Sequence, residues 1–395
     1  MDACERPVGT ETPGQPPAEG AGGPRDRAGH DAPALTPGAR AGKGKERPGS
    51  GADWTWPLAV YGGALLVVVL ALTAVILAMG ANPAEALATA LQDSLLTVGG
   101  LGQTLNRMTP LLLASLSFAV GYRAGLFNIG MDGQIYAGAI LATGLGLLFA
   151  GAAGGGGAGL MPLLLLAGLA GGALYAVLPA ALRVLWGVNE IFTTVMFNFV
   201  ALYLVEYLST GPWNDPTAGE AITRPIPGNA LLPLLIPRGG AHAGVLLAVA
   251  VALAIWWLLY RTVFGYELRS VGSNPQAARY AGIALGRIQV LALCLGGALS
   301  GLAGAIEVTG VHQRLLLGLS PNYGVMAILV AVLGRNHPLL LVPVNLAFAV
   351  LVAASDSLQR TVGLPASAVF MVQGLAVLVV LFLEAVRQRQ ARFTT

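Results

Sequence analysis

The sequence predicts an all-α fold: a polytopic transmembrane helix bundle of about ten spans (roughly nine to eleven), preceded by a disordered tail. Three observations lead to this prediction: 55% of the 395 residues are hydrophobic, only 10% are charged, and apolar stretches follow one another from Pro57 onward. An average soluble domain has about 25% charged residues, so this chain lacks the side chains for a water-facing surface. The composition excludes an ordinary cytosolic enzyme, a disordered regulator and a secreted disulfide scaffold.

Residues 1–53 are predicted to be a disordered cytoplasmic tail. They are rich in Gly, Pro, Ala and mixed charge, and they show no apolar periodicity. A signal peptide needs an apolar core of about 7–15 residues, which this segment lacks. We divide the rest into a transmembrane domain over 54–385 and a short basic cytoplasmic tail over 386–395.

The apolar stretches supply the predicted spans, because about 20 apolar residues cross roughly 30 Å of hydrocarbon. The spans are 57–80, 104–122, 131–150, 159–182, 190–209, 242–262, 287–308, 322–334, 338–354 and 366–384. The stretches 322–334 and 338–354 are short and close together, so they are either two tight spans or broken half-helices. The segment 82–103 is amphipathic and is expected along the outer interface or dipping into the protein.

The arginines predict the orientation. With the tail inside and about ten crossings, the arginines of the body concentrate in short cytoplasmic loops, as the positive-inside rule requires. Both termini are then cytoplasmic, the largest outer loop is 210–241 and the largest inner loop is 263–286. No arginine run or aromatic-basic stripe accompanies the net charge of +3. We therefore expect membrane lipid around this chain, and no nucleic acid polymer.

Polar side chains at membrane depth are candidates for a substrate pathway, because they are costly unless they line a cavity or pair inside the bundle. In GLFNIGMDGQIYAGAI, Asn128, Asp132 and Gln134 surround the start of a span among glycines that favour irregular backbone. The alternative is a helix N-terminus that Asn128 caps and whose dipole favours Asp132. The spacing does not decide between these interpretations.

A second polar group lies in NEIFTTVMFNFVALYLVEYL, where Thr194 and Asn198 share a helix face. Asn198 with Phe197 and the neighbouring aromatic residues would suit a flat polar ring such as a nucleobase. The alternative is hydrogen bonding between helices, worth about 0.6 kcal/mol on average. We favour the alternative for the threonines and the cavity role for Asn198.

The two halves of the chain also echo each other. Asn322-Tyr323-Gly324 precedes an apolar span, as Asn128-Ile129-Gly130 does. This short echo is compatible with a nested internal repeat. It adds Asn322 to the pathway candidates.

The inner loop contains ELRSVGSNPQAARYAGIALGR, which predicts a short rigid helix on the cytoplasmic face. Asn274 is a good N-cap, Pro275 suits the first helical position and Gly282 ends the helix. About seven residues then give a rod of roughly 10 Å. This element is either a loop that caps well or a handle through which a soluble partner tilts the flanking spans.

Catalytic motifs are absent from the sequence. It has no GxxxxGK[ST] loop, no HExxH and no GxSxG, and its four histidines are scattered. We expect that this chain is not an enzyme and binds neither a cofactor nor a metal, and a membrane enzyme is the least favoured class.

Three segments in this order resemble the permease subunits of bacterial ABC importers for simple sugars, branched-chain amino acids and nucleosides. They are RAGLFNIGMDGQ, NEIFTTVMFNFVALYL followed by Gly211-Pro212, and LRSVGSNPQAARYAGI. The likeness covers roughly residues 57–385 and is greatest to nucleoside (purine) permeases. Asp132 stands where such permeases often have glutamate, which keeps the charge and shortens the reach.

The resemblance implies a multi-pass protein of the bacterial inner membrane with several partners. These are a separate ATPase subunit that holds ATP and Mg²⁺, a second permease chain that tends to be a different protein, and an extracytoplasmic substrate-binding lipoprotein. It maps the grip of the ATPase onto Asn274, Pro275, Ala277, Ala278, Arg279, Tyr280 and Gly282.

Two other functions remain open. One is a permease for ribose or another simple sugar. The other is an ion-coupled secondary transporter, which needs an ionisable pair deep in the bundle. Asp132, Glu206 and Glu307 lie near the ends of predicted spans, so the secondary transporter is the weaker alternative.

Overall fold

A computed structural model describes residues 82–150 and 159–363, with isolated residues between 69 and 80 and between 371 and 382. The chain divides into two units, 1–53 and 54–395, and every described residue belongs to the second. Both predicted tails and most of the predicted spans 57–80 and 366–384 lie outside the described residues.

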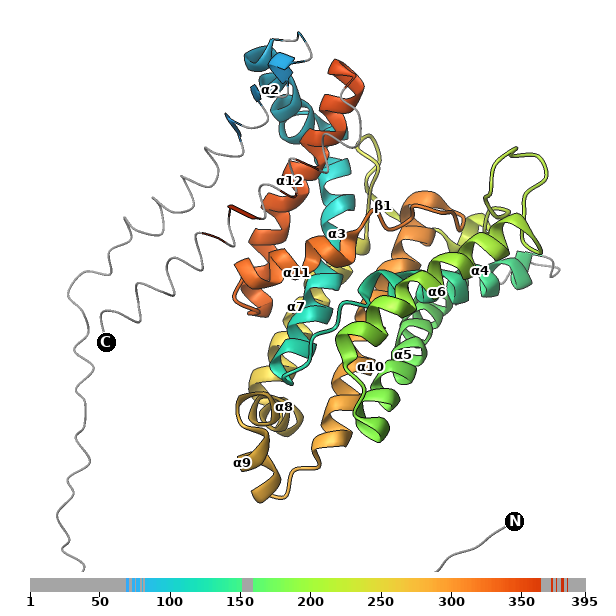
Figure 1. Cartoon of the computed structure of the whole chain (residues 1–395). Coiled ribbons are helices and arrows are strands. Elements are labelled where there is room, and N and C mark those ends of the chain that lie inside the picture. The colour runs from blue at the N-terminus through green and yellow to red at the C-terminus, as the bar shows by residue number, and fades with distance from the viewer. Residues whose placement is uncertain are drawn as a thin grey trace, which may run out of the picture. The chain divides into compact units, whose positions relative to one another are not determined.

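The described part is a helical bundle, as predicted (Figure 1). Six of its helices are long and apolar enough to cross a membrane. They are α4 (Met131–Ala150), α5 (Leu160–Trp186), α6 (Glu190–Thr210), α7 (Gly244–Arg261), α10 (Leu285–Ile306) and α12 (Pro338–Val362). The seventh long helix, α3 (Val98–Arg123), has 26 residues and is less apolar.

Shorter elements connect these helices. The helical ones are α2 (Pro83–Leu91), α8 (Val263–Ser273), α9 (Pro275–Tyr280) and α11 (Tyr323–Leu333), the π-helical turns η1 (Gln92–Leu96) and η4 (Glu307–His312), and the 3-10 turn η3 (Gly228–Ala230). Strands β1 (Leu234–Ile236) and β2 (Ala241–His242) pair antiparallel in the predicted outer loop 210–241.

The predicted amphipathic segment 82–103 is composed of α2, η1 and the first turns of α3. Asn82 accepts a hydrogen bond from the Ala84 N–H at 3.1 Å and Pro83 follows it, which starts α2. Thr97 caps α3 in the same way, since its hydroxyl accepts from the Gly100 N–H at 3.0 Å. The crossing expected at 104–122 therefore begins at Val98, six residues earlier than its apolar stretch.

Small residues allow the closest packing in the bundle, between α5 and α10. A Cβ atom added to Gly172 would overlap the Gly297 carbonyl, and one added to Gly301 would overlap the Gly168 carbonyl. Glycine stripes of this kind let two backbones touch where lipid supplies no hydrophobic drive for association. The glycines of α5 and α10 thus form a direct helix–helix contact.

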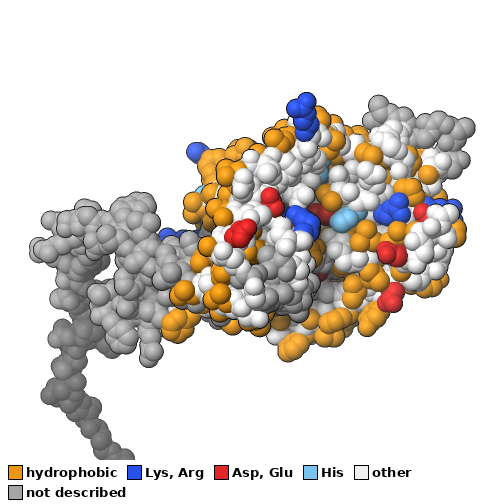
Figure 2. All heavy atoms as spheres, turned by 90° about the horizontal axis from the view of Figure 1, so that it is seen from above, with side chains coloured by type: hydrophobic (Ala, Val, Ile, Leu, Met, Phe, Trp, Pro, Cys, Tyr) orange, Lys and Arg blue, Asp and Glu red, His pale blue; other side chains and the backbone are white. Residues whose placement is uncertain are grey.

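Residues predicted on the same side of the membrane meet in the structure. Arg123, at the end of α3, donates to the Tyr260 hydroxyl at 3.1 Å and to the Asn336 carbonyl at 3.4 Å. At the other end, Arg107 forms an ion pair with Asp356 at 3.1 Å. Figure 2 looks onto this second end, where charged side chains lie across the face and apolar side chains are prominent along its edges. These contacts group the ends of α3 and α7 with the α11–α12 turn at one end of the bundle, and α3 with α12 at the other.

Candidate functional site

The first break in regular structure lies between α3 and α4. Gly125 adopts a left-handed conformation at φ 75°, and the chain stays irregular until Met131. The Asn128 side chain, only 1% exposed, accepts from the Gly130 N–H at 3.1 Å and donates to Gln134 Oε1 at 3.0 Å. Buried backbone away from water needs partners of this kind. The Asn128 side chain therefore satisfies backbone and side-chain groups around the start of α4, and its part in a substrate pathway stays a prediction.

Helix α6 fastens this break from the other side. The Asn198 carboxamide accepts from the Gly133 N–H at 2.8 Å and donates to the Ile129 carbonyl at 2.9 Å. One turn earlier, the Thr194 hydroxyl accepts from the Ile129 N–H at 3.3 Å. The predicted shared face of Thr194 and Asn198 is confirmed, and we call these contacts the α6 clasp.

Phe197, the aromatic pathway candidate, turns toward α5. Its ring packs edge-on against Tyr175 with centroids 5.4 Å apart, and its carbonyl accepts from the Tyr175 hydroxyl at 2.6 Å. The backbone of Phe197 also borders Gly133, where an added Cβ would lie 3.1 Å from its carbonyl oxygen. Phe197 thus adjoins the first break through its backbone.

The second break follows α10. That helix gives way to the π-helical turn η4, the chain is non-helical over 313–322, and α11 then begins. Because α11 has 11 residues, it is about 16 Å long, half of a membrane's hydrocarbon thickness. Of the two interpretations of 322–334, the broken half-helix is the one observed, whereas 338–354 belongs to the long helix α12.

The two breaks meet at Asp132. Its Oδ1 accepts from the Ser320 hydroxyl at 2.6 Å and from the Gly324 N–H at 2.9 Å. The carboxylate lies in the first turn of α4 and against the first turn of α11, where both helix dipoles favour negative charge. Asn322, next to this contact, is left-handed at φ 60°. The two echoing Asn-x-Gly sites are therefore neighbours in space.

The length of α11 indicates how far the Asp132–Gly324 contact lies from the end of the bundle at which Arg123 is found. The far end of α11 leads into the turn whose Asn336 carbonyl contacts Arg123 at the end of α3. The length of α11, about 16 Å, therefore separates the Asp132–Gly324 contact from that end, so the contact lies inside the bundle. Irregular backbone at this depth is tolerated only where protein buries it or water reaches it.

The predicted short helix in the inner loop is α9, and its local chemistry is as expected. Asn274 accepts from the Ala277 N–H at 3.0 Å, Pro275 is the first helical residue, and Gly282 is left-handed at φ 81°. Arg279 is exposed, and so is Tyr280, at 93%. The preceding helix α8 was not predicted.

Helix α8 connects α9 to the first break. Leu268 and Val271 of α8 are fully buried. A Cβ on Gly272 would overlap the Arg123 carbonyl, and one on Gly125 would lie 3.3 Å from the Gly272 Cα. Helix α8 therefore packs directly against the turn that starts the irregular segment.

Several contacts around the breaks were not predicted from the sequence. The Arg107 guanidinium donates to the Tyr323 hydroxyl at 3.0 Å besides its ion pair with Asp356, and so ties α11 to α3 and α12. Glu190 pairs with Arg183 at 3.3 Å and accepts from the Phe127 N–H at 3.5 Å. In the sequence, each of these contacts is visible only as charged residues near the ends of spans. A charged residue there does not reveal which residue it pairs with.

The outer loop is pinned to the segment before α11. The Thr223 hydroxyl accepts from the Leu315 N–H at 2.9 Å, and Arg314 lies 3.8 Å from Asp215. Hydrogen bonds from the hydroxyl and N–H of Thr217 hold the pKa of Asp215 below its usual range, and Arg314 adds to this effect. The loop 210–241 is thus coupled to the second break.

One face of α6 is left uncovered by the rest of the described chain. It carries an apolar and aromatic stripe at helical spacing: Phe192, Met196, Phe199, Tyr203 and Tyr207. Glu206 lies beside the two tyrosines, is exposed, and pairs with no cation among the described residues. A carboxylate on a lipid-facing surface is costly, so this face is suited to contact protein or water.

The long apolar helices and the two breaks inside the bundle define a multi-pass membrane protein of the transporter class. The chain belongs to the family described as branched-chain amino acid transport system / permease component, which matches residues 100–381. It is an ABC importer permease of the branched-chain and simple-sugar family, and the predicted resemblance is confirmed.

Three of the relatives carry a sugar or a nucleoside in their names. The glucose ABC transporter permease protein TsgB13 of Haloferax volcanii is 35% identical over 334 residues, which cover 80% of this chain and 86% of the relative. The nucleoside ABC transporter permease protein NupB of Lactococcus lactis is 32% identical, with coverage of 74% and 81%. The guanosine ABC transporter permease protein NupP of Bacillus subtilis is 31% identical, with coverage of 60% and 67%. No solved structure matches the chain.

Proposed function

We propose that this chain is the transmembrane subunit of an ATP-driven importer that moves nucleosides or related purines across the bacterial inner membrane by alternating access. The observation that carries the proposal is the contact path from α9 through α8 to the first break. A soluble motor that pulls on the exposed residues of α9 displaces Gly272 against the turn at Gly125. The first break, the α6 clasp and the Asp132 contact with α11 then rearrange together.

The motor in this proposal is a separate ATPase subunit that holds ATP and Mg²⁺, while this chain binds no cofactor. The ATPase grips the exposed residues Asn274, Pro275, Ala277, Arg279, Tyr280 and Gly282, while buried Ala278 anchors α9 to the bundle. This places α9 and both termini in the cytoplasm, in agreement with the arginine distribution. An extracytoplasmic lipoprotein then delivers substrate to the loop 210–241 at the opposite end.

The pathway in this proposal runs along the uncovered face of α6, against a second permease chain. Tyr203, Glu206 and Tyr207 provide polar groups on that face, and Phe199 provides an apolar ring. Asn128, Asp132, Gln134, Phe197, Asn198 and Asn322 belong to the pathway because they hold the two breaks that change as it opens. Aromatic rings at one-turn spacing favour a flat, stackable substrate.

A simple sugar is the second candidate. Aromatic faces also pack against sugar rings, and the glucose permease relative is 35% identical against 32% for the nucleoside permease. An ion-coupled carrier is the weaker alternative. Buried Glu307 pairs with His312 at 3.3 Å in η4, where the second break begins, and Gly310 of the same turn abuts His242.

Uptake by the complete importer tests the proposal. The chain is expressed with its ATPase, second permease and receptor in cells that lack nucleoside and sugar uptake, and labelled guanosine, adenosine, ribose and glucose are compared. We expect nucleoside uptake that a hydrolysis-deficient ATPase abolishes. Tyr203→Ala should lower uptake at least tenfold, whereas Leu253→Ala, at an exposed position of α7, should not. Uptake of glucose alone would refute the substrate, and uptake without ATP hydrolysis would refute the ABC mechanism.

A further inference from the structure

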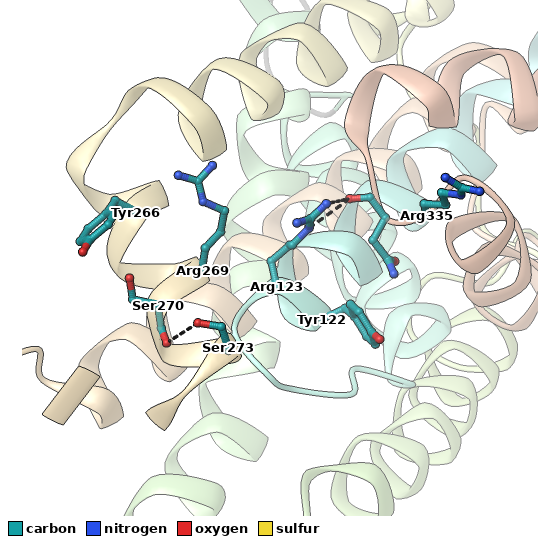
Figure 3. A pocket seen from close by; sticks show the side chains of 9 residues that line it. Tyr122, Arg123, Tyr266, Arg269, Ser270, Ser273 and Arg335 are labelled. Carbon is teal, nitrogen blue, oxygen red and sulfur yellow. Dashed lines mark hydrogen bonds between the residues drawn. The ribbon is translucent and has the colours of Figure 1, made fainter. Parts of the chain in front are cut away.

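A cavity of about 530 Å³ opens at the same end of the bundle as α8 and α9. Three separate elements line it: the end of α3, helix α8, and the turn between α11 and α12. In Figure 3, Arg123 lies in the middle of the view with Arg269 to one side and Arg335 to the other. The volume is within the range of about 300–1,000 Å³ that is typical of small-molecule sites.

The charge of this cavity is uncompensated. Arg123, Arg269 and Arg335 line it, and no Asp or Glu does. None of the three arginines takes part in an ion pair with the residues that the structure describes. Three positive charges around one cavity repel one another, and this repulsion falls when an anion enters.

Two of the arginines are held in place by one aromatic ring. The guanidinium carbon of Arg269 lies 4.9 Å from the centroid of the Tyr260 ring, and that of Arg123 lies 5.9 Å from it. Arg123 also donates to the Tyr260 hydroxyl and the Asn336 carbonyl. Its orientation is thus set by neutral acceptors, which leave its charge available to a ligand.

Hydrogen-bonding groups complete the lining. Asn336 also lines the cavity, and its buried Oδ1 has no hydrogen-bond partner among the described residues. A buried polar atom without a partner is costly, so a ligand that donates to Oδ1 is favoured. The hydroxyls of Ser270 and Ser273 lie on the α8 side, where Ser273 donates to the Ser270 carbonyl at 3.2 Å.

We infer that this cavity binds a phosphate-bearing anion. Guanidinium groups match phosphate oxygens in geometry and charge, and a hydroxyl or a protonated phosphate oxygen supplies the donor for Asn336. The same chemistry is offered by the head group of an anionic lipid such as phosphatidylglycerol and by a soluble phosphate compound. Because the cavity joins α8 to α3 and to the α11–α12 turn, a bound anion fixes α8. Its effect on transport rests on the proposed function, whereas the binding does not.

Binding is measured on the purified full-length chain after delipidation. Phosphatidylglycerol, zwitterionic phosphatidylcholine and inorganic pyrophosphate are titrated separately, with native mass spectrometry for the lipids and calorimetry for pyrophosphate. Arg269→Ala and Arg335→Ala should each weaken binding about tenfold, and added salt should weaken it further. Arg261→Ala is the matched control, since Arg261 is exposed at the end of α7 and does not line the cavity.

The outcomes separate the two sources. Binding of phosphatidylglycerol alone, sensitive to both variants, supports a lipid head group, and binding of pyrophosphate alone supports a soluble phosphate compound. The inference is overturned if neither binds, or if Arg261→Ala weakens binding as much as the cavity variants do. The Arg335 side chain is exposed and donates no hydrogen bond to the described residues, and its backbone bond to the Val332 carbonyl is kept in Arg335→Ala, so we expect this variant to fold.

Discussion

Removal of the α6 clasp is the sharpest test of how the breaks are held. Asn198→Ala deletes two hydrogen bonds, one from the Gly133 N–H at 2.8 Å and one to the Ile129 carbonyl at 2.9 Å. Hydrogen bonds between helices in membranes contribute about 0.6 kcal/mol on average and about 1.7 kcal/mol at most. Two of them therefore contribute about 1–3 kcal/mol to the free energy of local opening, which corresponds to about 5- to 150-fold in the opening equilibrium.

Amide hydrogen exchange measures this opening directly. Peptides that cover 125–135 should exchange about 5- to 150-fold faster in Asn198→Ala than in the unmodified protein, while peptides from the α5–α10 contact should not change. Thr193→Ala is the matched control on the same helix. Its hydroxyl donates only to the Asn189 and Glu190 carbonyls of its own turn, so exchange at 125–135 should stay within about twofold. Equal exchange rates in both variants, with both proteins folded, would refute the clasp.

Three further predictions follow from other contacts. Arg279→Glu should uncouple transport from ATP hydrolysis without lowering the yield of folded protein, since Arg279 is exposed. Gly272→Val should also uncouple them by displacing α8, with a loss of stability because its Cβ would overlap the Arg123 carbonyl. Normal uptake by both variants would contradict the contact path. Gly301→Val should destabilise the bundle by about 3 kcal/mol or more, measured by thermal unfolding in detergent, whereas Gly159→Ala, in open space, should not. Because the pKa of Asp215 is lowered, its ion pair should persist as the pH falls to about 4 and be lost below that. Proteolysis of the loop 210–241 should therefore rise only below about pH 4, and Asp215→Asn should abolish that dependence.

The sequence alone determined the features that depend on near neighbours in the chain. Hydropathy located the spans, because the length of an apolar run decides whether a helix crosses a membrane. The short helix α9 was predictable because Asn274, Pro275 and Gly282 act on backbone groups within a few residues of themselves. The polar residues before α4 were identifiable as unusual, because they are costly at that depth.

The tertiary structure alone decided which distant groups these residues meet. Asp132 reaches the Gly324 N–H across 192 positions, and Asn198 reaches Ile129 across 69. A polar group in a bundle takes its partner from whichever helix packs beside it, and glycine contacts such as that between α5 and α10 set this packing. The local sequence pattern therefore identified the residues that need partners. Helix packing determined which residues those partners are. It also limited α11 to a half-helix and brought three arginines together around one cavity.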